Sequence, residues 1–348
     1  MIIKQFKIII RLLFYSLIFL YLTAGVRYTG QYVEKIIAVG DIHGDFDAYK
    51  TILTDAGLID SNLNWSGGTT VFVQTGDIAD RGPDTRKIIN HLKNIQKQAP
   101  KAGGQVIALI GNHEAMNMTG DLRYVDPGEY EAFKTEDSDK LRDKLYAANQ
   151  QAVEDFYRAK NPDMSANMIR EAWNKIYPLG RLEHQRAWSP KGEIGKWVVN
   201  NPAVVLIDGN LFVHGGLSQE YASLSLKKLN KRVKSDLKKQ IESDDSIIHD
   251  SDGPLWYRGN TASKAPDNEG KDTETELEAV LGAFGADRLI VGHTPGLKGI
   301  KSKYNGRLIQ IDTGASKYYG GTRSFLRIEN GHLYAHNDEA EPELLNSE

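Results

Sequence analysis

Five short segments rich in glycine carry carboxylate, imidazole and amide side chains that can bind metal ions, and they constrain this chain more than any other feature. The segments span residues 40–44, 76–82, 111–114, 214–216 and 292–294. The first three and the last follow apolar or β-branched runs, so their polar groups stand where strands are expected to end. One Gly-Asp pair is usually an ordinary turn. Five segments in this order predict a single site that holds two metal ions and hydrolyses a phosphate ester.

An alternation of strand-like and helix-like segments begins after residue 30. Apolar runs at 35–39, 70–74 and 105–110 predict buried strands, and helical spacing at 46–56 and 84–98 predicts helices between them. This order is typical of βαβ units, so we expect an α/β fold with a mainly parallel beginning to its sheet. Ligands bind beyond the carboxyl ends of such strands, which is where the polar segments fall.

The second half of the chain is organised differently. Residues from about 120 to 190 are highly charged but also carry aromatic side chains, which favours a helical insertion, with helices around 127–158 and 165–177. Further helices are expected at 224–241 and 277–284, and further strands at 197–207, 210–214, 288–291, 307–312 and 324–329, with the late strands antiparallel. A hairpin turn is expected at 208–210. Residues 259–272 are predicted to form a mobile loop, and the acidic tail at 337–348 is predicted to fray.

The composition excludes several classes of protein. The 348 residues are 40% hydrophobic, which is enough for a large core, and we expect one catalytic domain over residues 30–336. A net charge of −3 gives no sign of a nucleic-acid surface. The chain has no cysteine. Disulfides, cysteine-ligated zinc and a phosphatase that forms a cysteinyl-phosphate are therefore excluded.

The first 25 residues have the pattern of an export signal. Lys4, Lys7 and Arg11 precede an apolar run at 12–22, and small residues follow up to Gly25. The run is about a dozen residues, short of the roughly 20 that a spanning helix needs. We expect export to a bacterial periplasm with cleavage near Gly25. The alternative is an uncleaved anchor in the inner membrane, which is the only membrane contact that we expect.

The ligand candidates combine oxygen and nitrogen donors, as dinuclear hydrolytic centres do. They are two carboxylates, three imidazoles and one amide: Asp41, His43, Asp77, Asn112, His214 and His293. Asp41 and His43 lie two residues apart and can face one ion, whereas Asp77, at the end of the second strand, is the natural bridge. The second ion is expected to be bound by Asn112, at the end of the third strand, and by the two later histidines.

Four side chains near these ligands are expected to act on the substrate. His113 follows Asn112 but should point elsewhere by strand alternation, which makes it the best general acid. Asp80 could hold the far ring nitrogen of His113 and raise its pKa. The planar fork of Arg81 suits two phosphate oxygens, and Arg258 is a plausible partner from a distant loop. Asn112 is also a candidate for contact with the substrate.

Other polar and aromatic residues receive ordinary interpretations or stay open. Glu114 could be a ligand, but a hydrogen bond that supports its loop is favoured. Trp256 could contact the substrate or belong to the core, and Tyr318 and Tyr319 could lie at the pocket edge or on the plain surface. The basic face of residues 224–241 is interpreted as solvated. Five histidines are interpreted as surface or hydrogen-bonded residues: His91, His184, His249, His332 and His336.

The order of the five segments resembles the phosphoprotein phosphatase family within the calcineurin-like metallophosphoesterases. The resemblance is carried by Gly-Asp-Ile-His-Gly, Gly-Asp-Ile-Ala-Asp-Arg-Gly, Gly-Asn-His-Glu, His-Gly-Gly-Leu-Ser and Gly-His-Thr, over residues 36 to about 315. It implies a four-layer β-sandwich flanked by helices and the same six metal ligands. It also implies His113 as the acid, Asp80 as its partner and Arg81 as a phosphate clamp; Arg258 matches only in outline.

Within that family, the long segment between Gly-Asn-His-Glu and His-Gly-Gly is similar to the Shewanella-like phosphatases. The resemblance implies a protein phosphatase with two divalent ions (Mn, Fe or Zn). Its substrates would be phosphoproteins or phosphopeptides carrying phosphotyrosine, or phosphoserine and phosphothreonine. Metal-activated hydroxide would attack phosphorus directly, with no phosphoenzyme.

One segment departs from the pattern of the eukaryotic relatives. Residues 312–316 read Asp-Thr-Gly-Ala-Ser, where those enzymes have a Ser-Ala-Pro-Asn-Tyr type of loop. This ending resembles bacterial diadenosine tetraphosphatases, so hydrolysis of nucleotide polyphosphates or small phosphoesters is the alternative function. A non-catalytic binding protein is disfavoured because no expected ligand is missing.

Overall fold

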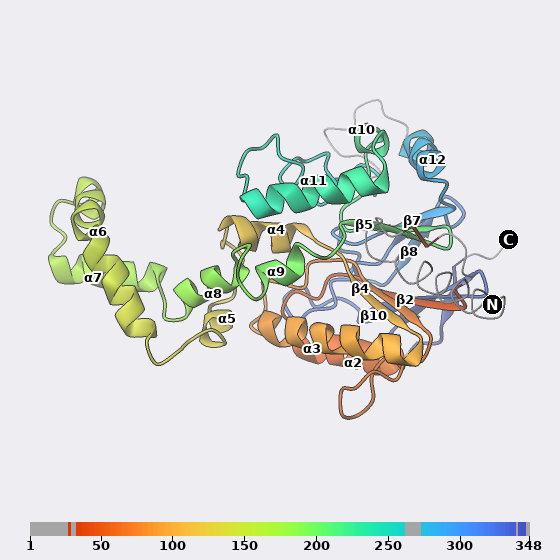
Figure 1. The fold of residues 1–348 in the computed structure, drawn as a ribbon, viewed down its shortest axis with the longest axis horizontal. Coiled ribbons are helices and arrows are strands. Elements are labelled where there is room, and N and C mark those ends of the chain that lie inside the picture. Colours follow the sequence, from red (N-terminus) through yellow and green to blue (C-terminus); the bar gives the residue numbers. More distant parts are fainter. Residues whose placement is uncertain (1–26, 29–32, 262–272, 339, 346–348) are drawn as a thin grey trace, which may run out of the picture.

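The computed structural model describes residues 27–28, 33–261, 273–338 and 340–345, and it contains two stacked six-stranded sheets between layers of helices (Figure 1). The strands of one sheet are, in spatial order, β12 (Glu343–Leu344), β11 (His332–Asn337), β10 (Ser324–Glu329), β2 (Lys35–Val39), β3 (Val71–Gln74) and β4 (Gln105–Ala108). The strands of the other are β1 (Arg27–Tyr28), β5 (Val204–Ile207), β6 (Asn210–Val213), β7 (Arg288–Val291), β9 (Leu308–Gln310) and β8 (Lys301–Lys303). The predicted α/β class and its two-sheet sandwich are confirmed.

The sheets begin as the sequence predicts, because β2, β3 and β4 pair in parallel. Side chains of β2 alternate between two apolar clusters. Ile36 and Ala38 pack with residues of the other sheet, whereas Ile37 and Val39 pack with the helices outside. Both faces of the strand are thus buried, which explains why its sequence is an unbroken apolar run.

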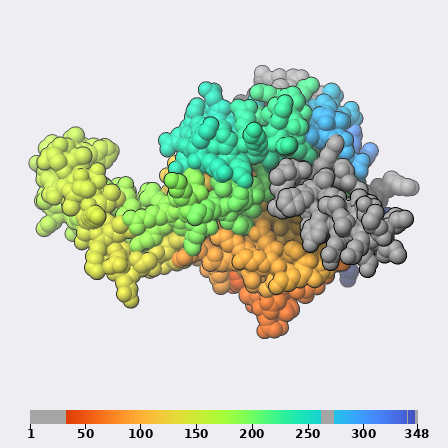
Figure 2. Space-filling view, viewed as in Figure 1, coloured from red at the N-terminus to blue at the C-terminus, as the bar shows by residue number. Residues whose placement is uncertain are grey.

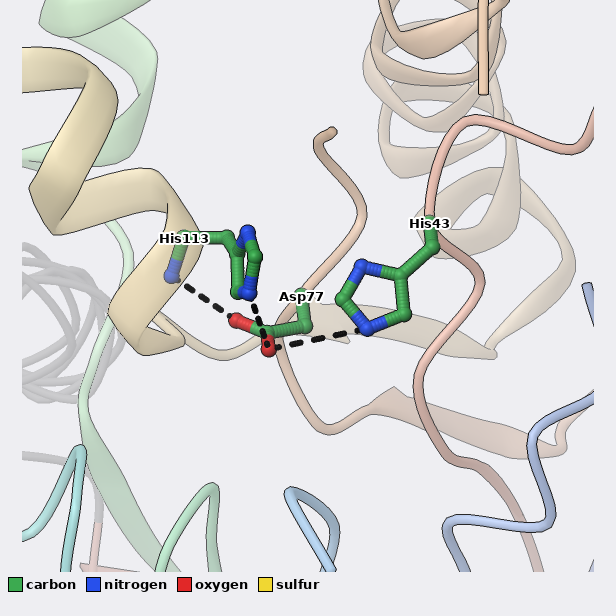
Figure 3. Close-up of side chains that lie close together, drawn as sticks. All are labelled: His43, Asp77 and His113. Atoms are coloured by element: carbon green, nitrogen blue, oxygen red, sulfur yellow. Dashed lines mark hydrogen bonds and ion pairs between the residues drawn. The ribbon is translucent and has the colours of Figure 1, made fainter. Parts of the chain in front are cut away.

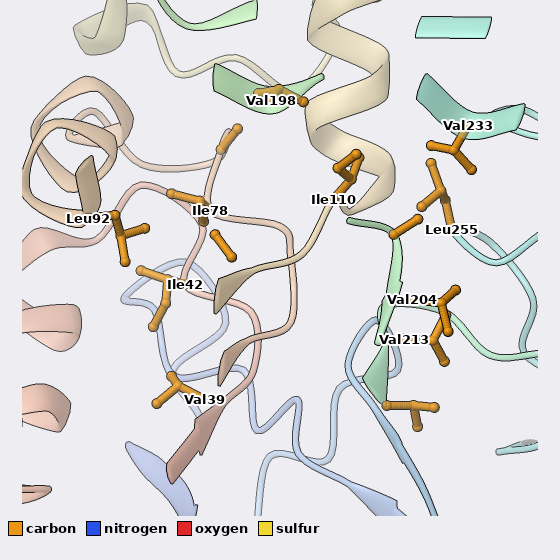
Figure 4. Packing of buried hydrophobic residues seen from close by; sticks show 14 of the residues in the cluster. Val39, Ile42, Ile78, Leu92, Ile110, Val198, Val204, Val213, Val233 and Leu255 are labelled. Carbon is orange, nitrogen blue, oxygen red and sulfur yellow. The ribbon is translucent and has the colours of Figure 1, made fainter. Parts of the chain in front are cut away.

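Helices cover the outer face of each sheet (Figure 1). The covering helices are α2 (Phe46–Asp55) and α3 (Thr85–Gln98) on one side, and α11 (Leu226–Lys239) and α12 (Thr273–Phe284) on the other. The predicted apolar face of α3 is fully buried: Ile88, Ile89, Leu92 and Ile95. Figure 4 shows how such side chains meet those of the strands and of the loops that follow them. Each fully buried Leu or Ile stabilises the fold by about 1.5–3 kcal/mol relative to an exposed one.

The predicted helical insertion is present and projects from the sandwich as an arm (Figures 1 and 2). Its helices are α5 (Pro127–Glu131), α6 (Ser138–Lys160), α7 (Ala166–Ile176) and α8 (Arg181–Trp188). In the outer part of the arm, Tyr146 of α6 meets Trp173 of α7 edge to face at 5.6 Å. At its base, His184 and Trp188 are completely buried, so the arm is anchored to the sandwich by α8. The remaining short helices are η1 (Ala99–Ala102), α4 (Asn112–Thr119), α9 (Gly195–Val198) and α10 (Gln219–Ala222).

The strand predicted at 197–207 is wrong in its first half. Residues 195–198 form helix α9, and β5 begins only at Val204. Trp197 donates a hydrogen bond from Nε1 to Gln96 Oε1 (2.8 Å), so this apolar stretch is buried against α3 as a helical turn. Pro202 has no N–H for a sheet ladder and precedes the true strand.

The C-terminal part of the chain differs from prediction in two ways. Strand β9 is antiparallel to β8, as expected, but parallel to β7, whereas β10 is antiparallel to β2. The tail is not wholly frayed, because β12 pairs with β11. The hairpin turn at 208–210 is confirmed, with Asp208 and Gly209 both at positive φ.

Two predictions fall on residues outside the described ranges. These are the N-terminal export segment and most of the polar loop at 259–272. None of the helices within residues 33–261, 273–338 and 340–345 is long and apolar enough to cross a membrane.

Candidate metal centre

The six predicted ligands converge at one edge of the sandwich, where strands of both sheets end. Residues 41, 43, 77 and 112 follow β2, β3 and β4, and residues 214 and 293 follow β6 and β7. Every one of the six side chains is at most 5% exposed. Gly292 allows the loop after β7 to approach the loop after β2, since a Cβ at residue 292 would lie 2.5 Å from an Asp41 oxygen.

The first half of the centre consists of Asp41, His43 and Asp77. His43 Nδ1 lies 3.0 Å from Ala79 O, so this nitrogen carries the proton and Nε2 keeps a lone pair. That lone pair lies 3.8 Å from Asp41 Oδ2 and 3.9 Å from Asp77 Oδ2. These separations are too long for hydrogen bonds but leave room for an ion between the three atoms.

The second half brings together atoms that can all offer lone pairs to a cation. His214 Nδ1 lies 2.9 Å from Thr75 O, which leaves Nε2 facing the other candidate ligands. This Nε2 lies 2.9 Å from Asn112 Oδ1, 3.2 Å from His293 Nδ1 and 3.3 Å from Asp77 Oδ1. Imidazole nitrogens and carboxylate or amide oxygens at such separations can coordinate one cation between them. The residues present therefore fit a divalent ion.

Asp77 belongs to both halves, which is the position expected of a bridging carboxylate. It forms one group of possible metal ligands with His43 and His113, and another with His214 and His293. In Figure 3, His43 and His113 approach Asp77 from opposite sides. Its Oδ1 faces the second half and its Oδ2 the first.

The carboxylates of the centre are crowded in a way that favours cations. Burial raises the pKa of Asp41 well above its ordinary value, and repulsion from Asp312 and Asp77 raises it further. Burial likewise raises the pKa of Asp312 to about 6, with Asp77 contributing. Burial also opposes ionisation of Asp77, but the surrounding histidines hold its pKa well below the ordinary value.

Asp312 was not recognised as a residue of the site from the sequence. It follows β9 as the other polar groups follow their strands, and it is 3% exposed. A strand-end carboxylate was therefore an available signal.

The backbone around the ligands is held in unusual conformations. His43, Asp77, Asp80, Arg81 and His293 all have positive φ. Such conformations cost about 1–3 kcal/mol each and persist only where other contacts fix them. At Asp77, one fixing contact is a hydrogen bond from its backbone N–H to a buried carboxylate.

That carboxylate is Glu114, which accepts hydrogen bonds from four backbone N–H groups. Oε2 accepts from Gly111 (2.8 Å) and Asp77 (2.9 Å), and Oε1 accepts from Ile78 (2.9 Å) and Ala79 (3.2 Å). Glu114 thus ties the segment after β3 to the start of α4. Its position matches the favoured interpretation as loop support.

His113 is placed by a helix, so the strand alternation assumed for it is wrong. β4 ends at Ala108, and Asn112 and His113 open α4, with Gly111 as the N-cap. The backbone N–H of His113, free at this helix start, donates to Asp77 Oδ1 (2.9 Å). His113 Nε2 lies 3.8 Å from Asp77 Oδ2, so the ring faces the first half of the centre.

The far nitrogen of His113 has the partner that the sequence predicts. Nδ1 lies 2.6 Å from Asp80 Oδ2, and Asn117 Nδ2 donates to Asp80 Oδ1 (2.8 Å). Burial alone would lower the pKa of His113, but the Asp77 and Asp80 carboxylates raise it above the ordinary value. The two carboxylates thus stabilise the protonated form of the His113 ring.

The two predicted arginines both reach the centre, in different ways. Arg81 packs its guanidinium on the rings of Tyr124 (4.5 Å), Tyr318 (4.8 Å) and Tyr319 (5.2 Å). Within the described part of the chain, it has no carboxylate within 4.0 Å. Arg258 donates from its guanidinium to His293 O (2.8 Å) and Thr294 Oγ1 (3.1 Å), so it is partly occupied.

The aromatic residues left open by the sequence lie near the centre. Tyr319 lies 5.4 Å from the ring of His43, which makes it an edge of the site. Trp256 lies 5.9 Å from the ring of His293 and donates from Nε1 to Ile248 O (2.9 Å). Tyr124, next to His113, was not predicted, because nothing in its local sequence marks it as a residue of the site.

Comparisons with known proteins agree with this geometry. The sequence profile described as "Calcineurin-like phosphoesterase" matches residues 34–297. An uncharacterized protein of Schizosaccharomyces pombe is 34% identical, covering 86% of this chain and 78% of its own length. Shewanella-like protein phosphatase 2 of Arabidopsis thaliana is 31% identical, covering 82% of this chain and 72% of its own. The crystal structure of a cold-active protein-tyrosine phosphatase from a psychrophilic Shewanella species is 28% identical, with a TM-score of 0.67 over 90% of this chain and 81% of that one.

Proposed function

The chain belongs to the calcineurin-like metallophosphoesterase family, and from that premise we propose that it is a dinuclear protein phosphatase that hydrolyses phosphomonoesters of phosphoproteins. The observation that carries the proposal is Asp77, whose two oxygens face separate groups of buried acceptor atoms. Relatives named as protein phosphatases support the substrate class. They do not favour the alternative of a diadenosine tetraphosphatase.

Two sets of residues would hold the ions. Asp41, His43 and Asp77 would bind one ion, and Asp77 would share the second with the remaining residues: Asn112, His214 and His293. The mixture of oxygen and nitrogen donors suits Mn, Fe or Zn. When bound, such a pair neutralises phosphate oxygens and lowers the pKa of water.

The protein's own groups would bind the phosphate and move one proton. Arg81 would bind phosphate oxygens, because its charge has no carboxylate partner among the described residues. Arg258 would assist from the rim near His293. His113 would give its Nε2 proton to the departing oxygen, while Asp80 holds Nδ1 and thereby fixes the ring. No side chain needs to take up the phosphoryl group in this scheme.

The proposal is tested by metal content and substrate profile together. We would purify the chain without residues 1–25, measure bound metals by mass spectrometry, and compare phosphotyrosine, phosphoserine and phosphothreonine peptides of one sequence with diadenosine tetraphosphate. About two ions per chain and faster turnover of a phosphopeptide are expected. Faster turnover of diadenosine tetraphosphate would overturn the proposed substrate class.

We also propose that the protein is exported to the periplasm. The basic and apolar pattern of residues 1–25 supports this location. Cell fractionation and the intact mass of the chain recovered from cells test it. Recovery of an uncleaved chain from the membrane fraction would support the inner-membrane anchor instead.

A further inference from the structure

Five side chains around Asp77 form a closed cycle of ring contacts. His43 contacts Tyr319 (5.4 Å), Tyr319 contacts the Arg81 guanidinium (5.2 Å), and Arg81 contacts Tyr124 (4.5 Å). Tyr124 contacts His113 (5.2 Å), and His113 returns to His43 (4.8 Å). Tyr318 adds a further ring on Arg81 at 4.8 Å. The phosphate-binding arginine and the proton donor are thus parts of one aromatic frame.

The frame is fixed by contacts of its backbone. The loop that carries Tyr318 and Tyr319 is closed by a hydrogen bond from Gly321 N to Gly314 O (2.8 Å). The same loop is attached to the start of α2 by a hydrogen bond from Lys317 N to Asp45 Oδ2 (2.8 Å). On the opposite side, Arg81 N donates to Tyr124 O (2.9 Å). The rings are therefore positioned before a substrate arrives, so that binding need not order them.

The guanidinium of Arg81 packs among aromatic rings and has no acidic partner. Its central carbon lies 4.5–5.2 Å from the centroids of three tyrosine rings, whereas no carboxylate of the described chain lies within 4.0 Å of it. Its buried Nε has no hydrogen-bond partner among the described residues. A guanidinium that packs on rings in this way can still offer its N–H groups to phosphate oxygens. The group attached to the phosphate would then lie next to the rings that flank Arg81.

Two of those rings are open to solvent. Tyr318 is 60% exposed and Tyr124 is 39% exposed, although both pack on Arg81. Exposed aromatic faces next to a phosphate-binding group suit a planar aromatic substituent. We propose that Tyr318 and Tyr124 determine specificity by stacking on the ring of an aryl phosphate such as phosphotyrosine while Arg81 binds its phosphate. This inference deepens the proposed phosphatase function and depends on it for its substrate.

The expected preference is moderate. Contact between a pair of aromatic rings changes an equilibrium by about two- to tenfold beyond the effect of buried area. A phosphoserine side chain has no ring, so its binding gains nothing from ring stacking. The frame would therefore favour phosphotyrosine mainly through KM, because the contact exists in the bound ground state as well as in the transition state.

The test compares Tyr318→Leu and Tyr318→Phe in the full chain loaded with Mn²⁺. Two peptides of one sequence, carrying phosphotyrosine or phosphoserine, provide the kinetic readout. We expect Tyr318→Leu to lower kcat/KM about three- to tenfold more for the phosphotyrosine peptide than for the phosphoserine peptide, mostly by raising KM. Tyr318→Phe should retain the preference. Tyr124→Leu should act in the same direction, and Phe156→Leu, an exposed ring on α6 (53%), is the matched control.

A binding measurement separates failure of this inference from failure of the proposed function. Calorimetric titration with phenylphosphonate and methylphosphonate breaks no bond, so it reports on the frame even if no peptide is hydrolysed. Tighter binding of phenylphosphonate that disappears in Tyr318→Leu supports the inference. Equal losses for both ligands, or for both peptides, would show that Tyr318 only positions Arg81, and the inference would be wrong. An unchanged preference in both tyrosine variants would also overturn it.

Discussion

His113 Nδ1 lies 2.6 Å from Asp80 Oδ2 in the interior of the protein, with both side chains at most 5% exposed. The carboxylate keeps one proton on Nδ1 of His113. A second proton, on the charged ring, would then lie on Nε2, which faces Asp77 and the expected position of the substrate. Asn117 holds the other Asp80 oxygen, so the arrangement extends one residue further into the core.

The pair leads to a prediction about catalysis. Replacing a general acid costs about 10²–10⁴-fold in rate, so His113→Asn should lose nearly all activity while keeping its metal content near normal. Asp80→Asn should lose less, about 10–100-fold, because it acts only through His113. Steady-state kinetics together with metal analysis checks both variants. Intact activity in His113→Asn would show that the acid is another group.

Metal binding should depend on Asp77 more than on Asp41, because only Asp77 faces both acceptor groups. We expect Asp77→Asn to lose both ions and Asp41→Asn to lose one. Asp163→Asn, an exposed aspartate between α6 and α7, is the matched control. Inductively coupled plasma mass spectrometry of the three purified variants gives the answer directly. Loss of both ions from Asp41→Asn alone would contradict the assignment of ligands.

Removing the ions should also destabilise the fold. Ligands that bind only the folded state add about 2.7 kcal/mol at 100 times their Kd. Without them, the buried carboxylates Asp41, Asp77 and Asp312 repel one another. A chelator should therefore lower the melting temperature, and Mn²⁺ should restore it. A melting temperature that chelation leaves unchanged would argue against a buried metal pair.

Glu114 should be important for stability although it touches neither substrate nor ion. In Glu114→Gln, an amide group replaces one oxygen and points its own donors at backbone donors. We expect a loss of about 3 kcal/mol in the free energy of unfolding, since bonds to a charged acceptor are worth about 1.5–3 kcal/mol each. Urea unfolding checks this value, with the exposed Glu171→Gln on α7 as control, for which the change should stay within about 0.5 kcal/mol.

The stability of the protein should respond to mild acid through His336, which lies in β11. Burial lowers the pKa of His336 to about 4, assisted by Arg327 and Lys35, whereas the ordinary value is 6.5. Between these pH values the unfolded chain binds more protons than the folded one, so the free energy of unfolding falls as pH falls from 6.5 to 4. His336→Gln cannot take up this proton and should show a shallower decline. Equal slopes for the two proteins in urea titrations at several pH values would contradict the prediction.

The sequence predicts the convergence of the six candidate ligands because each follows an apolar run. Asp41, Asp77 and His293 follow strands whose character is clear from a few β-branched residues, and parallel pairing brings their ends to one edge. Asp312 obeys the same rule but was not recognised. The direction of the His113 side chain is predicted from strand alternation, but His113 lies in the first turn of α4. The local sequence pattern does not distinguish the end of β4 from the start of this helix.

The aromatic frame could not be predicted in the same way. Tyr124 follows no strand, and its place beside Arg81 depends on how the chain after α4 folds back. The loop that carries Tyr318 is attached to the start of α2 by the hydrogen bond from Lys317 to Asp45, which lie far apart in the sequence. The strand predicted around Trp197 is wrong for a related reason. The apolar residues of this segment suit a strand and a helical turn equally well.

The hydrogen bond from His293 N to Asp41 Oδ1 (3.1 Å) joins two positions that lie 252 residues apart. A polypeptide emerging from the ribosome therefore possesses Asp41, His43, Asp77 and Asn112 long before it possesses His293. Until translation passes that point, the nascent chain has only some of the six side chains that would hold the ions. Catalytic competence is thus a property of the finished polypeptide, acquired late in synthesis.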